Sequence, residues 1–513
     1  MDVSLMDARG ETSGSSLTRR LGTGVGWLMI GRLGLAFSGL ASSVALARLM
    51  SPREFGMMAA ITVVLFLGNA LTEGGFVSPI IQRTQVDADL RNAVFSLSAI
   101  FGLVLGALAA VASPWVAGFF RIEGLEWPLL AAVVIIPIKA MAAPAIGLLM
   151  RDHRYREVTV AALLSNIFAY SIVAILLAAL GFGIWALVIP SILAALTELV
   201  LVGRAAGPPR KFVWRITDRN FIRDWRASVS SGLLNWGALS SPNVIVGRLF
   251  GADGLGLYSR AGSLFSMATQ LFSTTVERVM FSGLSGVQED SERVTLLFRR
   301  MLSVLLPIYV TIGVGLAIHA EPIIRILFGS QWLAAIPVTS VLFLAFSGRA
   351  SYKISESLAL SKGRFNSVAF RQLLYLVLVS VGLLVGSPHG LVGVASGFTA
   401  AIWIFYVVSV LQARHLVDLS WASIAFVHLR AVGIAGVGAF ADIAAIWSFS
   451  RFGWLLSHGA GAMAFVIVLA VTMSLLPDRI IGEDLVWARR RIFSLIKIRT
   501  GRPVVGLPVV SVD

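Results

Sequence analysis

The sequence predicts an all-α integral membrane protein with about fourteen transmembrane helices, and three observations support this prediction. Hydrophobic residues make up 57% of the 513 residues, and charged residues make up only 13%. The mean hydropathy is +0.85, whereas soluble domains carry about 25% charged residues. Apolar stretches of about 20 residues, long enough to cross the hydrocarbon of a bilayer, recur along the chain. Backbone polar groups in lipid must be paired within the protein, which favours helices.

A span length of about 20 residues divides the chain into fourteen spans, with short outer turns at 181–183 and 388–389. The predicted spans are 25–49, 57–81, 92–116, 127–150, 157–180, 184–203, 228–250, 256–282, 296–318, 333–360, 366–386, 390–411, 427–449 and 454–476.

The positions of lysine and arginine orient these spans. Cytoplasmic loops of membrane proteins are enriched in both residues. Inside segments with the adjoining span ends hold 29 of the 42 basic residues, outside segments with the outer span ends hold 5, and the remaining 8 lie within spans. An error in the span count would reverse the bias partway along the chain, yet the alternation persists to the end. Both termini are therefore predicted to be cytoplasmic.

The composition excludes several classes of site. The chain has no cysteine, which rules out disulfides, iron–sulfur clusters, thiolate metal sites and a cysteine nucleophile. The six histidines stand far apart, and no HExxH pair occurs. We therefore expect no metal, no cofactor and no catalytic residue.

Three pairs of segments indicate an internal duplication. Their offsets along the chain are 200, 210 and 207, and they occur in the same order. The chain thus contains two copies of six spans. Because six is even, the copies share one orientation, and parallel repeats of this kind place a cleft between them. The segment pairs are 47–57 with 247–257, 148–158 with 358–368, and 183–187 with 390–394.

The duplication sets the predicted domain organisation. The last tail carries apolar residues at helical spacing, with basic residues mostly on the other side. This pattern suits a helix lying on an anionic leaflet, and a merely basic tail is the alternative. The predicted parts are a flexible cytoplasmic tail at 1–24, a six-helix lobe at 25–203, a basic cytoplasmic linker at 204–227, a second six-helix lobe at 228–411, two additional helices at 412–476, and a basic cytoplasmic tail at 477–513.

Four motifs resemble the polysaccharide transporter (Wzx/WzxC-like) family of lipid-linked oligosaccharide flippases, within the multidrug/oligosaccharidyl-lipid/polysaccharide exporter superfamily. The resemblance covers roughly residues 17–476 and does not specify the sugar. The motifs are LARLMSPREFG at 46–56, GGFVSPIIQR at 74–83, GRLFGADGLGLYSRA at 247–261 and LFGSQW at 327–332.

This resemblance implies two six-helix lobes that form a V and alternate between inward and outward openings. The implied substrate is an undecaprenyl-pyrophosphate-linked oligosaccharide, a repeat unit of exopolysaccharide, capsule or O-antigen. Translocation would carry it to the outer leaflet of the bacterial inner membrane. A polysaccharide polymerase and chain-length machinery would be partners. The energy source varies within the family.

Basic residues inside spans are the candidates for binding a pyrophosphate, because a charge in the bilayer costs about 3 kcal/mol or more unless it faces a polar interior. Snorkelling toward a span end is the alternative for Arg32 and Arg248, and Arg371 is expected to snorkel. The candidate substrate-binding residues are Arg32, Lys139, Arg248, Arg260, Arg349 and Lys353.

Lys139 and Arg349 form the most specific hypothesis. They lie deep in spans four and ten, at the offset of 210 shared by a repeat match. Two buried like charges repel each other and lose hydration, and a pyrophosphate between the lobes would relieve both costs. The alternative is that each pairs with a local carboxylate.

Acidic residues inside spans are candidates for coupling or gating. Glu277 and Glu356 stand next to Arg278 and near Lys353, so structural ion pairs are the alternative for both. Glu73 has no basic neighbour in sequence. It could titrate during a coupling cycle or form a pair between the lobes.

Two other functions remain open. One is a MATE-like small-molecule exporter, although drug cations prefer acidic or aromatic pockets. The other is an integral-membrane polysaccharide polymerase or glycosyltransferase. Such enzymes usually need carboxylates beside a sizeable loop, and the predicted outside loops are short.

The orientation gives a first testable prediction. Reporter domains fused after Asp513 and within 204–226 should both report the cytoplasm, because both segments belong to the arginine-rich side. A reporter inserted at 181–183 should report the opposite side. A periplasmic signal from the C-terminal fusion would contradict the span count.

Overall fold

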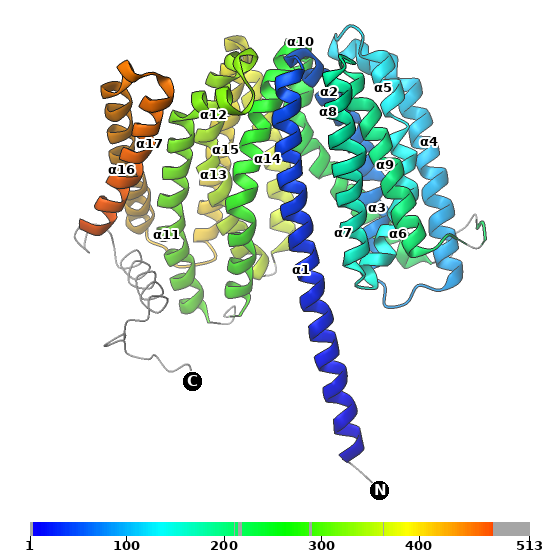
Figure 1. The fold of residues 1–513 in the computed structure, drawn as a ribbon. Helices are drawn as coiled ribbons and strands as arrows, with labels where there is room; N and C mark the ends of the chain where they lie inside the picture. The colour runs from blue at the N-terminus through cyan, green and yellow to red at the C-terminus, as the bar shows by residue number, and fades with distance from the viewer. Residues whose placement is uncertain (1–3, 210, 214–217, 287–289, 363, 476–513) are drawn as a thin grey trace. The chain divides into compact units, whose positions relative to one another are not determined.

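The computed structural model describes residues 4–209, 211–213, 218–286, 290–362 and 364–475, and this part of the chain is helical throughout, without a β-strand (Figure 1). Within it, eleven helical stretches are long and apolar enough to cross a membrane. The fold class is therefore all-α and multi-pass, as predicted. The predicted basic tail at 477–513 lies outside the described residues.

The predicted count of fourteen is not confirmed by these eleven stretches. One of them, Phe370–Arg414, contains two helices that the sequence separates at 388–389. The predicted spans 228–250 and 256–282 both lie on α10 (Arg219–Ser285), which is not among the eleven. A non-helical backbone at Gly251, with φ 66° and ψ −161°, separates them. The count of fourteen stays a prediction.

Contacts between Cα atoms divide the chain into two units, Met1–Arg260 with Arg325–Ala334 and Ala261–Ile324 with Ala335–Asp513. This division groups residues by contact and not by repeat, so the predicted lobe boundaries stay a prediction. The first unit contains α1 (Ser4–Leu49), α2 (Pro52–Leu71), α3 (Glu73–Ile81), α4 (Ala88–Phe120), α5 (Glu126–Ala132), α6 (Ile135–Arg151), α7 (Tyr155–Leu164), α8 (Val173–Ala179), α9 (Trp185–Ala206) and the first part of α10.

Helix α6 is the centre of the first unit, since it packs against α2, α3, α4, α7 and α9. Breaks interrupt three predicted spans: Thr72 separates α2 from α3, Val133 and Val134 separate α5 from α6, and a π-helical stretch at Ser165–Ile172 joins α7 to α8. Helix α1 begins at Ser4, so the described backbone before residue 25 is helical, and the flexibility of this tail stays a prediction.

The second unit is built around α13 (Ile336–Ser361), which contacts α11, α14 and α15. The final helices α16 and α17 pair with each other, and α16 also packs against α11 (Figure 1). The remaining helices are α11 (Ser291–Ile318), α12 (Ala320–Leu327), which crosses the boundary between the units, α14 (Phe365–Gly386), α15 (Gly390–Arg414), α16 (Trp421–Ser448) and α17 (Trp454–Leu475).

Three of the four family-like motifs meet in the first unit, around the turn between α1 and α2. Ser51 caps α2 in a reciprocal pair of hydrogen bonds with Glu54. Trp332 is fully buried, donates from Nε1 to the Ala47 carbonyl over 2.7 Å, and packs edge-on against Phe55. These contacts explain why residues 325–334 belong to the first unit.

The motif at 247–261 lies on α10, and this helix crosses α2 where two glycines, Gly56 and Gly256, meet. A Cβ added at Gly56 would overlap the Ala252 carbonyl, and one added at Gly256 would overlap the Pro52 carbonyl. Helices that pack in a membrane approach this closely only where small residues meet. This crossing therefore cannot accept any larger side chain.

The crossing gives a testable prediction. Gly256→Ala should lower the thermal midpoint of the purified protein by several degrees. The added Cβ would meet the Pro52 carbonyl, and a backbone carbonyl cannot move aside as a flexible side chain can. Gly262→Ala on the same helix is the matched control, since no atom lies within 4 Å of its added Cβ. Equal midpoints for the two variants would show that the helices do not cross here.

Candidate functional site

The second unit holds a cluster of basic side chains on its central helix. Arg349 and Lys353 lie one turn apart on α13, and Lys353 forms an ion pair with Glu356 (Nζ to Oε2, 2.6 Å). The Arg349 Nη1 donates to the Tyr352 hydroxyl over 2.6 Å. The predicted stripe of Arg349, Lys353 and Glu356 is thus present as one local group.

Aromatic rings hold the Arg349 guanidinium. Its Cζ lies 5.0 Å from the ring centroids of both Tyr352 and Tyr375, the latter on α14. Phe405 of α15 packs edge-on against both tyrosines. Guanidinium groups stack on such rings while their N–H groups stay available for hydrogen bonds. Three helices therefore fix the position of this guanidinium.

Arg371 joins this cluster, which the sequence did not predict. Only 4% of the residue is exposed, and it interacts electrostatically with Glu356 and Tyr352. Its Nη2 is buried without a hydrogen-bond partner. The expectation that Arg371 snorkels is therefore wrong. We call the three basic residues Arg349, Lys353 and Arg371 the cationic cluster, and among the described residues Glu356 is a carboxylate that lies with them.

The first unit carries a different charged group beside its central helix. Lys139 of α6 pairs with Glu198 of α9 (Nζ to Oε2, 2.5 Å). Glu73, the first residue of α3, interacts electrostatically with both of them. The acidic triad (Glu73, Lys139 and Glu198) thus contains two carboxylates and one ammonium group.

This pairing bears on the hypothesis for Lys139 and Arg349. Its premise was two unpaired cations, and that premise is wrong for Lys139, which has a carboxylate partner inside its own unit. Glu198 was not singled out from the sequence, because it stands 59 positions from Lys139. For Glu73, the tertiary structure supplies the basic neighbour that the local sequence lacks.

The other predicted basic residues do not join either group. Arg260 donates to the Ser43 hydroxyl over 2.9 Å and stacks on Phe55 at 4.1 Å. Arg248 donates to the Phe119 carbonyl at the end of α4. Arg32 is exposed on α1. The side chain of Glu277 lies outside the described residues.

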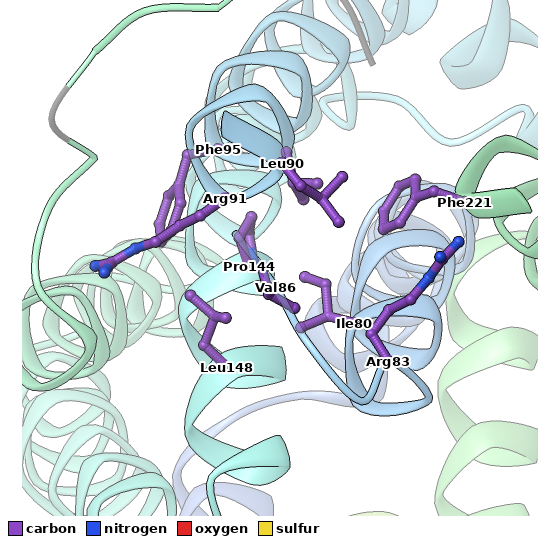
Figure 2. A pocket seen from close by; sticks show the side chains of 10 residues that line it. Ile80, Arg83, Val86, Leu90, Arg91, Phe95, Pro144, Leu148 and Phe221 are labelled. Carbon is purple, nitrogen blue, oxygen red and sulfur yellow. The ribbon is translucent and has the colours of Figure 1, made fainter. Parts of the chain in front are cut away.

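Figure 2 shows a small apolar pocket in the first unit, between α3, α4, α6 and the start of α10. Its two arginines point away from each other and are already engaged. Arg83 pairs with Asp218 at 2.6 Å, and Arg91 donates to the Ala206 and Gly207 carbonyls at the end of α9, each over 2.8 Å. Carbonyls at a helix C-terminus attract cations. We interpret these arginines as anchors for the segment between α9 and α10.

Comparisons with known proteins agree with this architecture. A family model described as polysaccharide biosynthesis protein matches residues 45–337. The succinoglycan biosynthesis transport protein ExoT of Rhizobium meliloti is 27% identical over 63% of this chain and 65% of its own length, slightly less than two thirds. The lipopolysaccharide biosynthesis protein WzxC of Escherichia coli is 22% identical over 75% of this chain and 78% of its own.

A solved structure shares the fold. The lipid II flippase MurJ in an inward closed conformation superposes with a TM-score of 0.71, covering 87% of this chain and 98% of its own. The two sequences are 15% identical. At this identity the similarity establishes the fold alone.

The acidic triad gives a testable prediction. Lys139→Met should lower the free energy of unfolding by roughly 3 kcal/mol, because it leaves two carboxylates uncompensated. Glu198→Leu should cost less, since Glu73 remains as a partner for Lys139. The double variant Lys139→Met/Glu198→Leu should recover part of the loss, as expected for coupled neighbours.

Thermal or denaturant unfolding in detergent would measure this cycle. The exposed pair of Asp290 and Arg293 is the control, and Arg293→Ala should change stability little. Additive effects of the two triad substitutions would contradict the pairing.

Proposed function

Because the chain belongs to the polysaccharide biosynthesis protein family, we propose that it is a flippase for an undecaprenyl-pyrophosphate-linked oligosaccharide. It would carry a repeat unit of exopolysaccharide, capsule or O-antigen across the bacterial inner membrane, with both of its own termini in the cytoplasm. Two six-helix lobes would alternate in access. The polymerase and chain-length machinery would receive the product. We assign no catalytic step and no cofactor.

The cationic cluster is the observation that supports this proposal most directly. A pyrophosphate cannot cross hydrocarbon without compensation of its charge. Arg349, Lys353 and Arg371 bring three positive charges together on α13 and α14. Guanidinium forks suit phosphate oxygens, because they donate two parallel hydrogen bonds. In this proposal Arg349, Lys353 and Arg371 hold the pyrophosphate during part of the cycle.

The acidic triad takes a second role in the same proposal. A group with two carboxylates and one ammonium repels a pyrophosphate, so we do not place the substrate there. Glu73 is the candidate for coupling, and Glu356 is the candidate for releasing the substrate by competing for Lys353. Glu277 and the anionic-lipid contact of the 477–513 tail stay hypotheses from sequence.

The proposal predicts a specific accumulation. Deletion of the gene should leave undecaprenyl-pyrophosphate-linked oligosaccharide on the cytoplasmic leaflet, and the wild-type gene should restore export. Arg349→Gln and Lys353→Gln should each lower flipping about tenfold or more, because a charged hydrogen bond to phosphate contributes about 1.5–3 kcal/mol. Transfer of the purified lipid in proteoliposomes measures the rate.

Two comparisons make this experiment decisive. Arg451→Gln changes an exposed residue outside the cluster and should flip at the wild-type rate. All variants should reach the membrane in equal amounts. A deletion strain with unchanged lipid-linked intermediates that instead becomes sensitive to small cations would favour a multidrug exporter.

A further inference from the structure

Two histidines and an aspartate that are far apart in sequence meet where α11, α16 and α17 pack together. His319 directly follows α11, Asp442 lies on α16, and His458 lies on α17. All three belong to the second unit, and Figure 1 shows the pair of α16 and α17 beside α11. We call this group the histidine–aspartate cluster. It plays no part in the proposed binding of pyrophosphate.

The hydrogen bonding of His319 determines which of its nitrogens faces Asp442. Its Nε2 lies 3.2 Å from the backbone carbonyl of His458. A carbonyl only accepts hydrogen bonds, so Nε2 must carry the hydrogen. In a neutral His319, Nδ1 is therefore a bare acceptor. That nitrogen lies 3.5 Å from Oδ2 of Asp442, which as a carboxylate is also only an acceptor.

The carboxylate of Asp442 is buried, which makes two facing acceptors costly. Asp442 is 0% exposed, and neither of its carboxylate oxygens has a hydrogen-bond partner. The Nδ1 atoms of His319 and His458 are likewise buried without hydrogen-bond partners. A buried carboxylate without compensation costs several kcal/mol. This geometry therefore requires a positive charge or a hydrogen between the two acceptors.

His458 and its helix close the site from the other side. The rings of His319 and His458 pack edge-on, with centroids 5.4 Å apart. Helix α17 comes this close at Gly461, where a Cβ would overlap the Asp442 carboxylate. The pair of α16 and α17 thus rests on α11 partly through these three polar side chains.

A histidine on α16, His428, provides a comparison, because both of its ring nitrogens are hydrogen-bonded. The Nδ1 of His428 lies 2.7 Å from the Ile424 carbonyl, so it carries the hydrogen. Its Nε2 then accepts from the Tyr406 hydroxyl over 2.8 Å. Both ring nitrogens of a neutral His428 are therefore hydrogen-bonded. In a neutral His319, by contrast, the lone pair of Nδ1 faces the Asp442 carboxylate.

We propose that the histidine–aspartate cluster binds a proton, and that this proton fastens the α16–α17 pair to α11. With the proton on Nδ1, the His319 imidazolium donates to Oδ2 of Asp442, and the pair carries no net charge. Loss of the proton leaves an unpaired carboxylate in an apolar site and weakens the contact between the helices. Histidine is suited to this role, since its ordinary pKa lies near 6.5.

The surrounding groups are consistent with a proton as the ligand. Glu321 of α12 also acts on the cluster, through its electrostatic interaction with His458. Among the described residues, no set of three or more histidine, aspartate or glutamate side chains is arranged to hold a metal ion. In the predicted topology α11 ends on the outer side, so the cluster would respond to the pH outside the cytoplasm.

The sign of the pH dependence follows from linkage. If the folded protein keeps a proton that the unfolded chain releases, stability falls as pH rises above the ordinary pKa of histidine, about 6.5. One retained proton lowers the folding equilibrium constant about tenfold for each pH unit. The wild-type protein should therefore lose apparent thermal stability between about pH 6.5 and pH 8.5.

The test compares the wild-type protein with Asp442→Asn over this pH range, in detergent or nanodiscs. An asparagine amide can donate to Nδ1 of a neutral His319, so the variant needs no proton and its pH slope should flatten. His389→Gln, an exposed histidine in the same unit, should keep the wild-type slope. If Asp442→Asn does not accumulate, His319→Gln takes its place, because its amide can also donate to the carboxylate.

Two results would overturn the proposal. Equal pH slopes for wild type and Asp442→Asn would show that the cluster retains no proton. A wild-type midpoint that rises with added Zn²⁺ and falls with a chelator, with both effects lost in Asp442→Asn, would show that the site binds a metal ion instead.

Discussion

The cost of placing a charge inside an apolar bundle of helices controls the organisation of this protein. With lipid around it and little water inside, each ionised side chain needs a counter-charge, an aromatic face or a carbonyl. The structure uses all three partners. Glu198 neutralises Lys139, tyrosine rings hold Arg349, and the Phe119 carbonyl accepts from Arg248.

This constraint is met differently in the two units. Each unit has one central helix, α6 or α13, and each central helix carries a basic residue, Lys139 or Arg349. The surroundings differ. Carboxylates from α3 and α9 surround Lys139, whereas Arg349 is joined by Lys353 and by Arg371 from α14. The charged groups beside the two central helices therefore differ, and our proposal places the anion at the group on α13.

Several residues of the family-like motifs hold helices together. Ser51 caps a helix, Trp332 fastens the segment after α12 to the turn between α1 and α2, and Gly56 and Gly256 allow α2 and α10 to cross. None of these groups belongs to the cationic cluster.

Hydrophobic patterning alone determined the helical, multi-pass class of this protein, because lipid leaves the backbone few alternatives. Turn glycines at 181–183 and the stripe of Arg349, Lys353 and Glu356 were also predictable, since their spacing along one helix is local. Only the tertiary structure could assign partners across helices. Glu198 reaches Lys139 from α9, Arg371 turns inward from α14, and His319 meets Asp442 and His458 from three separate elements. Periodicity indicates which face of a helix is polar, but the identity of the opposing charge depends on which helices pack together.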